Sequence, residues 1–145
     1  MPATAGKIVA GVDGSQSSVA ALRWAVRQAE LTGGSVHAVI AWQFPLTTSG
    51  FSWVPTPAFD DVDYAGLAAK ALGAVVEQVS STVTVSQQVM EGDASQVLLD
   101  ASADAELLVV GNRGHGAFAD ALLGSVSERC VRHSHCPVVV VHAPA

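Results

Sequence analysis

The sequence has little charge, and the charge it carries is mostly negative. Only 14% of its 145 residues are Asp, Glu, Lys or Arg, and thirteen acidic residues against seven basic ones leave a net charge of −6. Proteins that bind DNA, RNA or anionic lipid through phosphate groups usually present a basic surface. We therefore expect neither a nucleic-acid partner nor a membrane partner.

Long hydrophobic runs are also missing. The apolar stretches are short and are interrupted by Gly, Asp or Ser, whereas a membrane-spanning helix needs about 20 apolar residues. The first residues, 1–7, lack the charged-then-apolar order of a secretion signal. These features predict a cytoplasmic protein.

Cysteine is scarce, with Cys130 and Cys136 as the two in the chain. Two cysteines cannot build the disulfide framework that stabilises many secreted domains. His133 and His135 lie between them, but Cys130 falls in an amphipathic helical pattern and Cys136 opens a separate apolar run, so the side chains should diverge. We predict no metal site.

What the sequence does have is hydrophobic residues, which make up 50% of the chain. That proportion excludes intrinsic disorder, and the length suits one compact domain with a single core. We expect one domain over residues 1–145.

Short apolar runs alternate with helical periodicities along the chain. Strands are predicted over 7–13, 35–42, 82–89, 106–110 and 137–141, and helices over 15–34, 64–79, 95–103 and a segment that includes 122–130. The alternation of polar and apolar residues over 82–89 predicts a strand at the edge of the sheet, and the apolar run 106–110 predicts an interior strand. The apolar segment 137–141 is predicted to be an edge strand that must be covered by another part of the protein or by a second chain. This alternation predicts an α/β fold, a three-layer sandwich with a five-stranded parallel sheet and helices on both faces.

The segment from 43 to about 59 has no clear period and is rich in Pro, Ser, Thr and Gly. Its aromatic residues are Phe44, Phe51, Trp53 and Phe59. They would form either a lid or partner-binding patch, or pack back onto the domain. The sequence leaves both alternatives open.

Two loops that follow strands have the composition of a phosphate site. One is Val12-Asp13-Gly14-Ser15, and the other runs from Gly111 to Gly116 and includes Arg113. Glycines allow backbone N–H groups to approach an anion, and arginine and nearby serine hydroxyls add donors. The alternative is that the glycines only form turns and close helix contacts, as we expect for Gly92 with a positive φ angle.

The better-known phosphate motifs are absent or weak. The chain has no Gly-x4-Gly-Lys-Ser/Thr sequence, which excludes a P-loop. Gly114-x-Gly116-x2-Ala119 matches a dinucleotide fingerprint only loosely, because no strand-end acidic residue follows it. A phospho-receiver domain needs a lysine late in the chain, whereas the lysines are Lys7 and Lys70.

The glycine pattern carries a resemblance. Gly111-x2-Gly114-x9-Gly124-Ser125, together with a first strand ending in Val12-Asp13-Gly14-Ser15, resembles the ATP-binding branch of the universal stress protein family. The similarity covers nearly the whole chain. It implies a Rossmann-like fold of the adenine-nucleotide alpha hydrolase type, ATP as the bound cofactor, and a homodimer in which the last strands pair.

Carried over position by position, the resemblance implies a nucleotide site. Val12 and Asp13 would contact the adenosine, with Asp13 accepting hydrogen bonds near the ribose or phosphates, and Ala41 would lie against adenine. Val110 and Gly111 would flank the nucleoside. The phosphates would be held by Arg113, by residues of the glycine motif and by the two residues that follow the motif. Besides Arg113, these residues are Gly114, Gly124, Ser125, Val126 and Ser127.

Binding is favoured over turnover. Phosphoryl transfer needs a motif lysine, paired magnesium carboxylates and a residue that positions water, and the sequence shows none of them. A single carboxylate, Asp13, is all that the sequence provides to indicate Mg²⁺ bound together with ATP. We expect a nucleotide-dependent regulator with no catalytic residues; the alternatives are a slow ATPase or nucleotidyl-transfer enzyme, and a nucleotide-free homodimeric adaptor.

Overall fold

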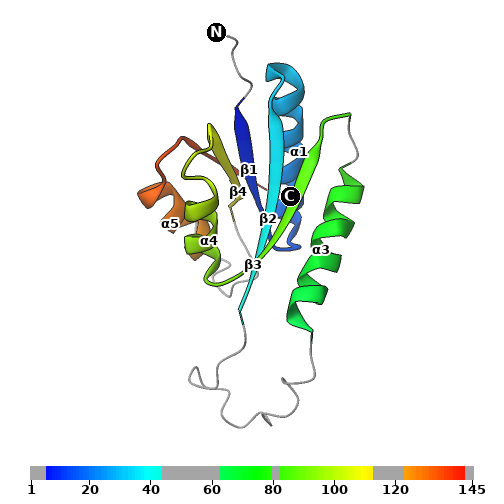
Figure 1. The fold of residues 1–145 in the computed structure, drawn as a ribbon. Coiled ribbons are helices and arrows are strands. Elements are labelled where there is room, and N and C mark those ends of the chain that lie inside the picture. Colours follow the sequence, from blue (N-terminus) through cyan, green and yellow to red (C-terminus); the bar gives the residue numbers. More distant parts are fainter. Residues whose placement is uncertain (1–5, 44–62, 80–81, 113–122, 143–145) are drawn as a thin grey trace, which may run out of the picture.

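The computed structural model describes residues 6–43, 63–79, 82–112 and 123–142. Strands and helices alternate as predicted (Figure 1). The strands are β1 (Lys7–Val12), β2 (Ser35–Trp42), β3 (Val85–Glu91), β4 (Leu107–Gly111) and β5 (Val138–Val141). The helices are α1 (Gln16–Thr32), α3 (Tyr64–Gln78), α4 (Ala94–Ala101) and α5 (Ser125–His133).

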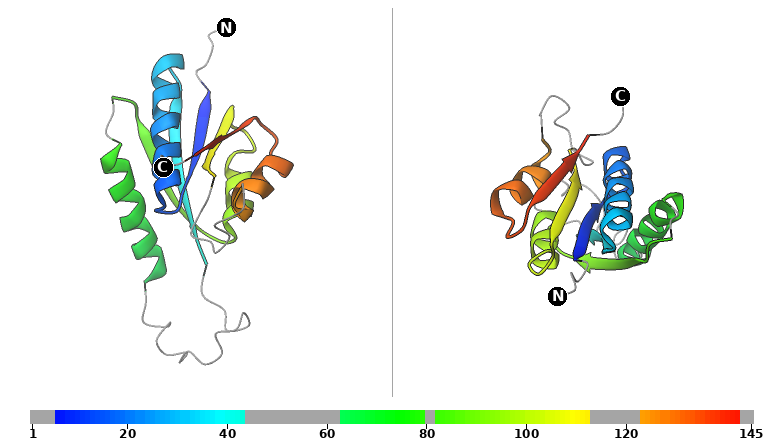
Figure 2. Two further views of the ribbon diagram at one scale, coloured as in Figure 1. Left: turned by 180° about the vertical axis from the view of Figure 1, so that it is seen from behind. Right: turned by 90° about the horizontal axis from the view of Figure 1, so that it is seen from above.

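The five strands form one parallel sheet in the order β3-β2-β1-β4-β5. Helices α1 and α3 cover one face and α4 and α5 the other, which gives the predicted three-layer sandwich (Figure 2). The polar strand β3 lies at one edge, β4 is interior, and the apolar strand β5 forms the other edge. Each of these strand positions confirms the prediction.

Alternating side chains divide the core between the two faces of the sheet. On β1, Ile8 and Ala10 pack with the α1 and α3 side, while Val9 packs with the α4 and α5 side. Leu22 of α1 and Leu108 of β4 are fully buried on opposite faces. Because both faces are covered, the strands can be apolar throughout, which explains the unbroken runs in the sequence.

Side-chain caps precede three of the four described helices. Ser15 caps α1 by accepting the backbone N–H of Ser18 at 3.2 Å. Helix α4 begins slightly earlier than the predicted 95–103, because Asp93 is its cap and accepts the N–H of Gln96 at 3.0 Å. At the other end of α1, Gly33 adopts a φ angle of 78°, the left-handed conformation that glycine permits.

Several features of the sequence lie outside the described residues. They include the middle-segment aromatics Phe44, Phe51, Trp53 and Phe59, and the middle of the glycine motif, residues 113–122. Within the described ranges, no helix combines the length and apolar character that a bilayer span requires.

Candidate functional site

A pocket opens at the carboxyl ends of the strands, where β1 and β4 are neighbours. Here the connections leave the sheet in opposite directions, which is the place where open parallel sheets usually bind ligands. The hollow has about 500 Å³ of space when the part open to solvent is included. It is lined by Gly11, Val12, Asp13, Ser18, Val39, Ala41, Ala94, Leu98, Val110, Gly111, Val126 and Ser127.

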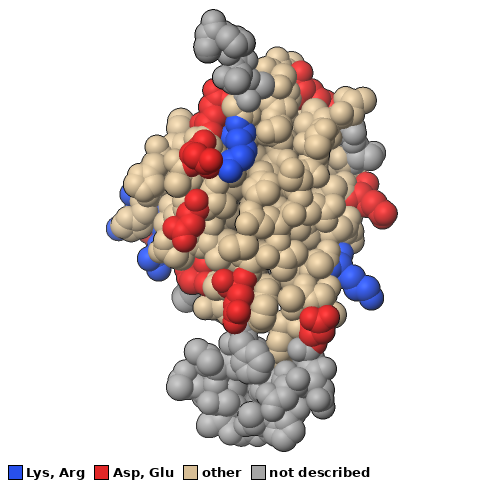
Figure 3. Space-filling view, in the orientation of Figure 1, with Lys and Arg blue, Asp and Glu red and all other residues tan. Residues whose placement is uncertain are grey.

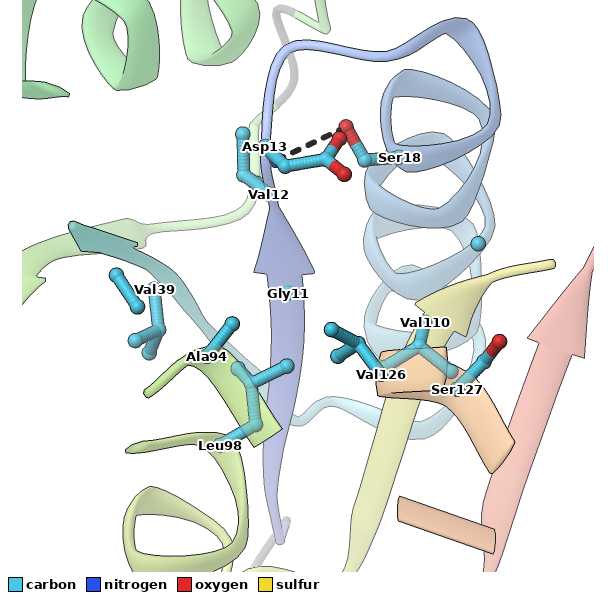
Figure 4. A pocket seen from close by; sticks show the side chains of 12 residues that line it. Gly11, Val12, Asp13, Ser18, Val39, Ala94, Leu98, Val110, Val126 and Ser127 are labelled. Carbon is cyan, nitrogen blue, oxygen red and sulfur yellow. Dashed lines mark hydrogen bonds between the residues drawn. The ribbon is translucent and has the colours of Figure 1, made fainter. Parts of the chain in front are cut away.

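The walls of the pocket are mostly apolar. Val39 comes from β2, Leu98 from α4, Val110 from β4 and Val126 from α5, so four elements converge on one space (Figure 4). Small side chains such as Ala41 leave room between them. Such walls suit a flat, weakly polar group such as a nucleobase.

Asp13 brings a carboxylate to the rim of the pocket. It is the first residue after β1, and its Oδ1 accepts the N–H of Ser15 at 2.8 Å. Its own N–H donates to Ser18 Oγ at 3.2 Å (Figure 4). A carboxylate can accept about four hydrogen bonds in all, so this group suits a ligand that carries hydroxyls.

The start of α5 lies beside the pocket and is capped without a side chain. Gly124 is the N-cap, its N–H donates to Asn112 O at 2.7 Å, and its carbonyl accepts the N–H of Glu128 at 2.9 Å. The N–H groups of the three residues between, Ser125 to Ser127, therefore precede the first hydrogen bond within the helix. Together with the helix dipole, such groups favour an anion.

The hydroxyl of Ser127 is not the hydrogen-bond donor to a ligand that its residue type suggested. Its side chain is 3% exposed, and Oγ lies 3.2 Å from the Gly124 carbonyl and 3.3 Å from the Asn112 carbonyl, to which it donates. A hydroxyl has a single proton. In this arrangement the donor that Ser127 offers to a ligand is its backbone N–H and not its hydroxyl proton.

The fold brings most of the predicted site residues together. Val12, Asp13, Ala41, Val110, Gly111, Val126 and Ser127 all line the pocket. Gly124 and Ser125 do not line it but immediately precede Val126 at the start of α5. Arg113 and Gly114 lie outside the described residues.

Two glycines near the site have structural explanations of their own. A Cβ atom on Gly111 would come within 2.7 Å of the Ser17 carbonyl carbon, so glycine is required there for β4 to pack against α1. Gly92 has a φ angle of 144°, which confirms the turn expected for it. Gly111 would therefore be needed with or without a ligand.

The sequence reasoning missed five lining residues, namely Gly11, Ser18, Val39, Ala94 and Leu98. One of them had a usable signal, because Val39 precedes Ala41 by two positions and so shares its side of β2. Ala94 and Leu98 are one helical turn apart and so share one face of α4, but this spacing does not say what that face meets. The packing of α4 beside β1 and β2, which turns Leu98 toward the pocket, leaves no local sequence pattern.

The pKa values of two titratable groups near the pocket are shifted by their surroundings. Hydrogen bonds from Ser95 and from the Gln96 backbone lower the pKa of Asp93, which precedes the lining residue Ala94. Burial in α5 raises the pKa of the Cys130 thiol to about 11, so it is protonated at neutral pH. Cys136 lies beyond α5, just before β5.

On the face of the molecule shown in Figure 3, basic side chains of the described residues are few and lie apart from one another. Lys7 is paired with Asp104 at 3.0 Å. Arg132 is paired with Glu128 on the surface of α5. No lining residue of the pocket is basic among those the structure describes.

Comparison with known proteins agrees with this architecture. The model of the universal stress protein family matches residues 4–142. Universal stress protein Rv2623 of Mycobacterium tuberculosis is 38% identical over 93% of this chain and 47% of its own length. Rv2624c of the same organism is 30% identical over 94% of this chain and 48% of its own length. The chain thus spans about half the length of the curated relatives it matches.

Solved structures share the fold. Universal stress protein UspA from Lactobacillus plantarum superposes with a TM-score of 0.78 at 22% identity, covering 96% of this chain and 99% of that one. A universal stress protein crystallised in complex with cAMP superposes with a TM-score of 0.63 at 26% identity, covering 98% and 100%. The family model spans nearly the whole chain, and the fold agrees with it: the chain belongs to the universal stress protein family.

Proposed function

We propose that this protein binds an adenine nucleotide in the pocket and acts as a regulatory binding module. One observation carries the proposal. The residues that the family resemblance assigns to the nucleoside, from the ends of β1, β2 and β4, line a single hollow at the reversal point of the sheet. They are far apart in sequence and are brought together by the fold alone.

The apolar part of the pocket suits the nucleoside. Ala41 and Val39 form a low wall on β2 against which adenine would lie, with Val12 on the adjacent strand β1 and Val110 on the next strand, β4. Asp13 at the rim would accept hydrogen bonds from the ribose or from groups near it.

The phosphates would lie at the start of α5. Backbone N–H groups of Ser125, Val126 and Ser127 supply donors without any side-chain charge, so a chain of net charge −6 can still hold an anion there. Gly124 allows close approach, and the proposal assigns Arg113 and Gly114 to the same phosphates by family resemblance. If Mg²⁺ accompanies ATP, the proposal assigns it to Asp13, which is the one carboxylate among the described lining residues.

A relative supports this choice of ligand. The universal stress protein in complex with cAMP is 26% identical to this chain and is matched over its full length. Its ligand shares the adenine and ribose with ATP and AMP. We take ATP as the expected cofactor and AMP and cAMP as its competitors.

We propose binding without turnover. Asp13 is the one ionisable group among the described lining residues, and a single carboxylate cannot supply the charge stabilisation of phosphoryl transfer. The slow-ATPase and nucleotide-free adaptor alternatives predict different behaviour. The cytoplasmic location and the absence of nucleic-acid and membrane partners stay predictions.

The proposal includes a homodimer formed through β5. Among the described strands it pairs only with β4, and each of its four valines is partly exposed. An apolar edge strand of this kind is normally covered. A second copy of the chain would cover it by strand pairing.

Melting temperature and phosphate release, measured together on protein stripped of co-purified ligand, separate the three functions. At an ATP concentration a hundred times Kd, binding adds about 2.7 kcal/mol to the free energy of unfolding, a rise of roughly 5–10 °C for a domain of this size. We expect that rise with phosphate release at background. Release that disappears in Asp13→Ala would indicate an ATPase, and no rise with any nucleotide would indicate the adaptor.

A further inference from the structure

Ser18 lies in the wall of the pocket, yet no ligand contact has been assigned to it. It is in the first turn of α1, three residues after the N-cap Ser15, and the residue is 3% exposed. A buried hydroxyl is normally hydrogen-bonded, here either to a ligand or within the chain. The hydrogen bonds of Ser18 decide between these roles.

The hydroxyl proton of Ser18 is used within the chain. Its Oγ donates to the Ser15 carbonyl at 3.0 Å and accepts the N–H of Asp13 at 3.2 Å. Because a hydroxyl has one proton, Ser18 cannot donate to a phosphate or base without losing its bond to Ser15. Direct recognition of the ligand by this donor is therefore disfavoured.

The bond that Ser18 accepts holds Asp13 from its backbone side. Asp13 is also held from its side chain, because Oδ1 accepts the N–H of Ser15 at 2.8 Å. The two contacts, of which Figure 4 shows the one with Ser18, fix one residue at both ends just where β1 stops and α1 has not begun. The direction in which the carboxylate faces the pocket depends on both.

The cap of α1 does not depend on the Ser18 hydroxyl. Ser15 Oγ accepts the backbone N–H of Ser18, a bond that any residue at position 18 could donate. Removing the hydroxyl would leave α1 capped and would change the anchoring of Asp13. This separates a role toward Asp13 from a role in helix formation.

We propose that Ser18 is a positioning residue for nucleotide binding, which acts by holding Asp13 in the orientation that accepts hydrogen bonds from the bound nucleotide. The inference rests on the proposed function. It predicts that the contribution of Ser18 to affinity exists only when Asp13 carries its carboxylate.

A double-mutant cycle tests this coupling. ATP is titrated into ¹⁵N-labelled wild type, Ser18→Ala, Asp13→Ala and the double variant, with amide shifts as the readout because they follow binding into the millimolar range. We expect Ser18→Ala to weaken ATP binding roughly threefold to tenfold in the wild-type background, and less than about twofold in the Asp13→Ala background. In the ligand-free protein, the Asp13 amide should exchange its hydrogen faster in Ser18→Ala.

Ser102→Ala is the matched control. Ser102 is 1% exposed, and its hydroxyl donates to the Leu99 carbonyl at 3.3 Å at the end of α4, so the variant also loses a buried serine hydroxyl. Its ATP affinity should equal that of the wild type. Equal losses from Ser18→Ala in both backgrounds, or no loss in either, would overturn the inference while leaving nucleotide binding intact. A wild type that shows no saturable shift would overturn the proposed function and the inference with it.

Discussion

At the scale of single residues, the two serines that line the pocket donate their hydroxyl protons to backbone carbonyls of the chain. Ser18 donates to Ser15 and Ser127 to the carbonyls before α5. The phosphate donors at the start of α5 are then its backbone N–H groups and the hydroxyl of the exposed Ser125. The conformation of Gly124 becomes more important than the hydroxyl at any one serine.

Gly124→Val tests that conclusion. The φ and ψ angles of Gly124, −70° and 167°, are open to any residue, so valine should be tolerated by the backbone. Loss of a favourable N-cap should cost about 1 kcal/mol of stability, while the branched side chain should block the approach of phosphate. We expect ATP affinity to fall at least about tenfold, a cost above about 1.4 kcal/mol, in a titration of the folded variant.

Gly73→Val provides the control for this substitution. Gly73 is in α3, away from the pocket, and a Cβ there would meet only the end of Gln87 at 3.9 Å. It should bind ATP like the wild type. An unchanged affinity in Gly124→Val would show that α5 does not hold the phosphates.

Individual residues also show where sequence reasoning succeeded and where it could not. Val12 and Asp13 were identified because they end an apolar strand, and the ends of parallel strands meet at one edge of the sheet. Val110 was assigned through the family resemblance, and it also lines the pocket. Leu98 was missed because its part in the pocket depends on how α4 packs across the sheet. Gly111 was identified as a ligand residue, whereas its packing against Ser17 already requires glycine.

At the scale of elements, α4 depends on its cap. The Asp93 carboxylate accepts hydrogen bonds from the Gln96 backbone and the Ser95 hydroxyl, which together lower its pKa. A lowered pKa in the folded state stabilises the fold at pH values above the unfolded pKa of about 3.8, and the effect disappears as the pH falls through the folded value. The helix therefore carries an acid-sensitive contribution to stability.

Asp93→Ala should lower the free energy of unfolding by about 1 kcal/mol at pH 7. The difference from the wild type should shrink as the pH falls below 3.8, because protonation weakens the wild-type cap. Urea unfolding at a series of pH values measures it. Asp93→Asn, which also caps helices, should stay close to the wild type at pH 7; a loss equal to that of alanine would mean that the charge, not the cap, matters.

The elements were predicted more completely than their ends. The apolar strands and the α1 and α3 periodicities follow from burial against a covered sheet, which leaves a pattern in the sequence. The start of α4 was placed late because Ser95 and Asp93 are both good caps, and the choice between them depends on where β3 ends. The residue that caps α4 is therefore determined by where β3 ends in the sheet and not by the local sequence.

At the scale of the whole molecule, the proposed homodimer would form through the edge strand β5. In its parallel register with β4, Val138 is paired with Leu108, and the Leu108 N–H donates to the Pro137 carbonyl. By the alternation of a parallel ladder, the Val140 N–H points away from β4. Proline at that position removes an outward donor and leaves the β4 ladder intact.

Val140→Pro should therefore convert the proposed homodimer into a monomer. Light scattering during size exclusion should give the wild type about twice the chain mass of 14.8 kDa, and the variant the mass of one chain. Gln87→Pro is the control, because Gln87 occupies the corresponding outward position at the opposite edge on β3. A wild type of single-chain mass at all concentrations, or a dimeric Val140→Pro, would contradict the β5 interface.

The most direct test of nucleotide binding is calorimetric titration of the stripped wild-type protein with ATP, AMP and cAMP, each with and without Mg²⁺. We predict saturable binding near one nucleotide per chain, and the order of affinities would identify the ligand that the protein senses. Dependence of ATP affinity on Mg²⁺ would support a metal-linked role for Asp13. If none of the three nucleotides binds, the pocket is not a nucleotide site and the glycine motif serves the fold alone.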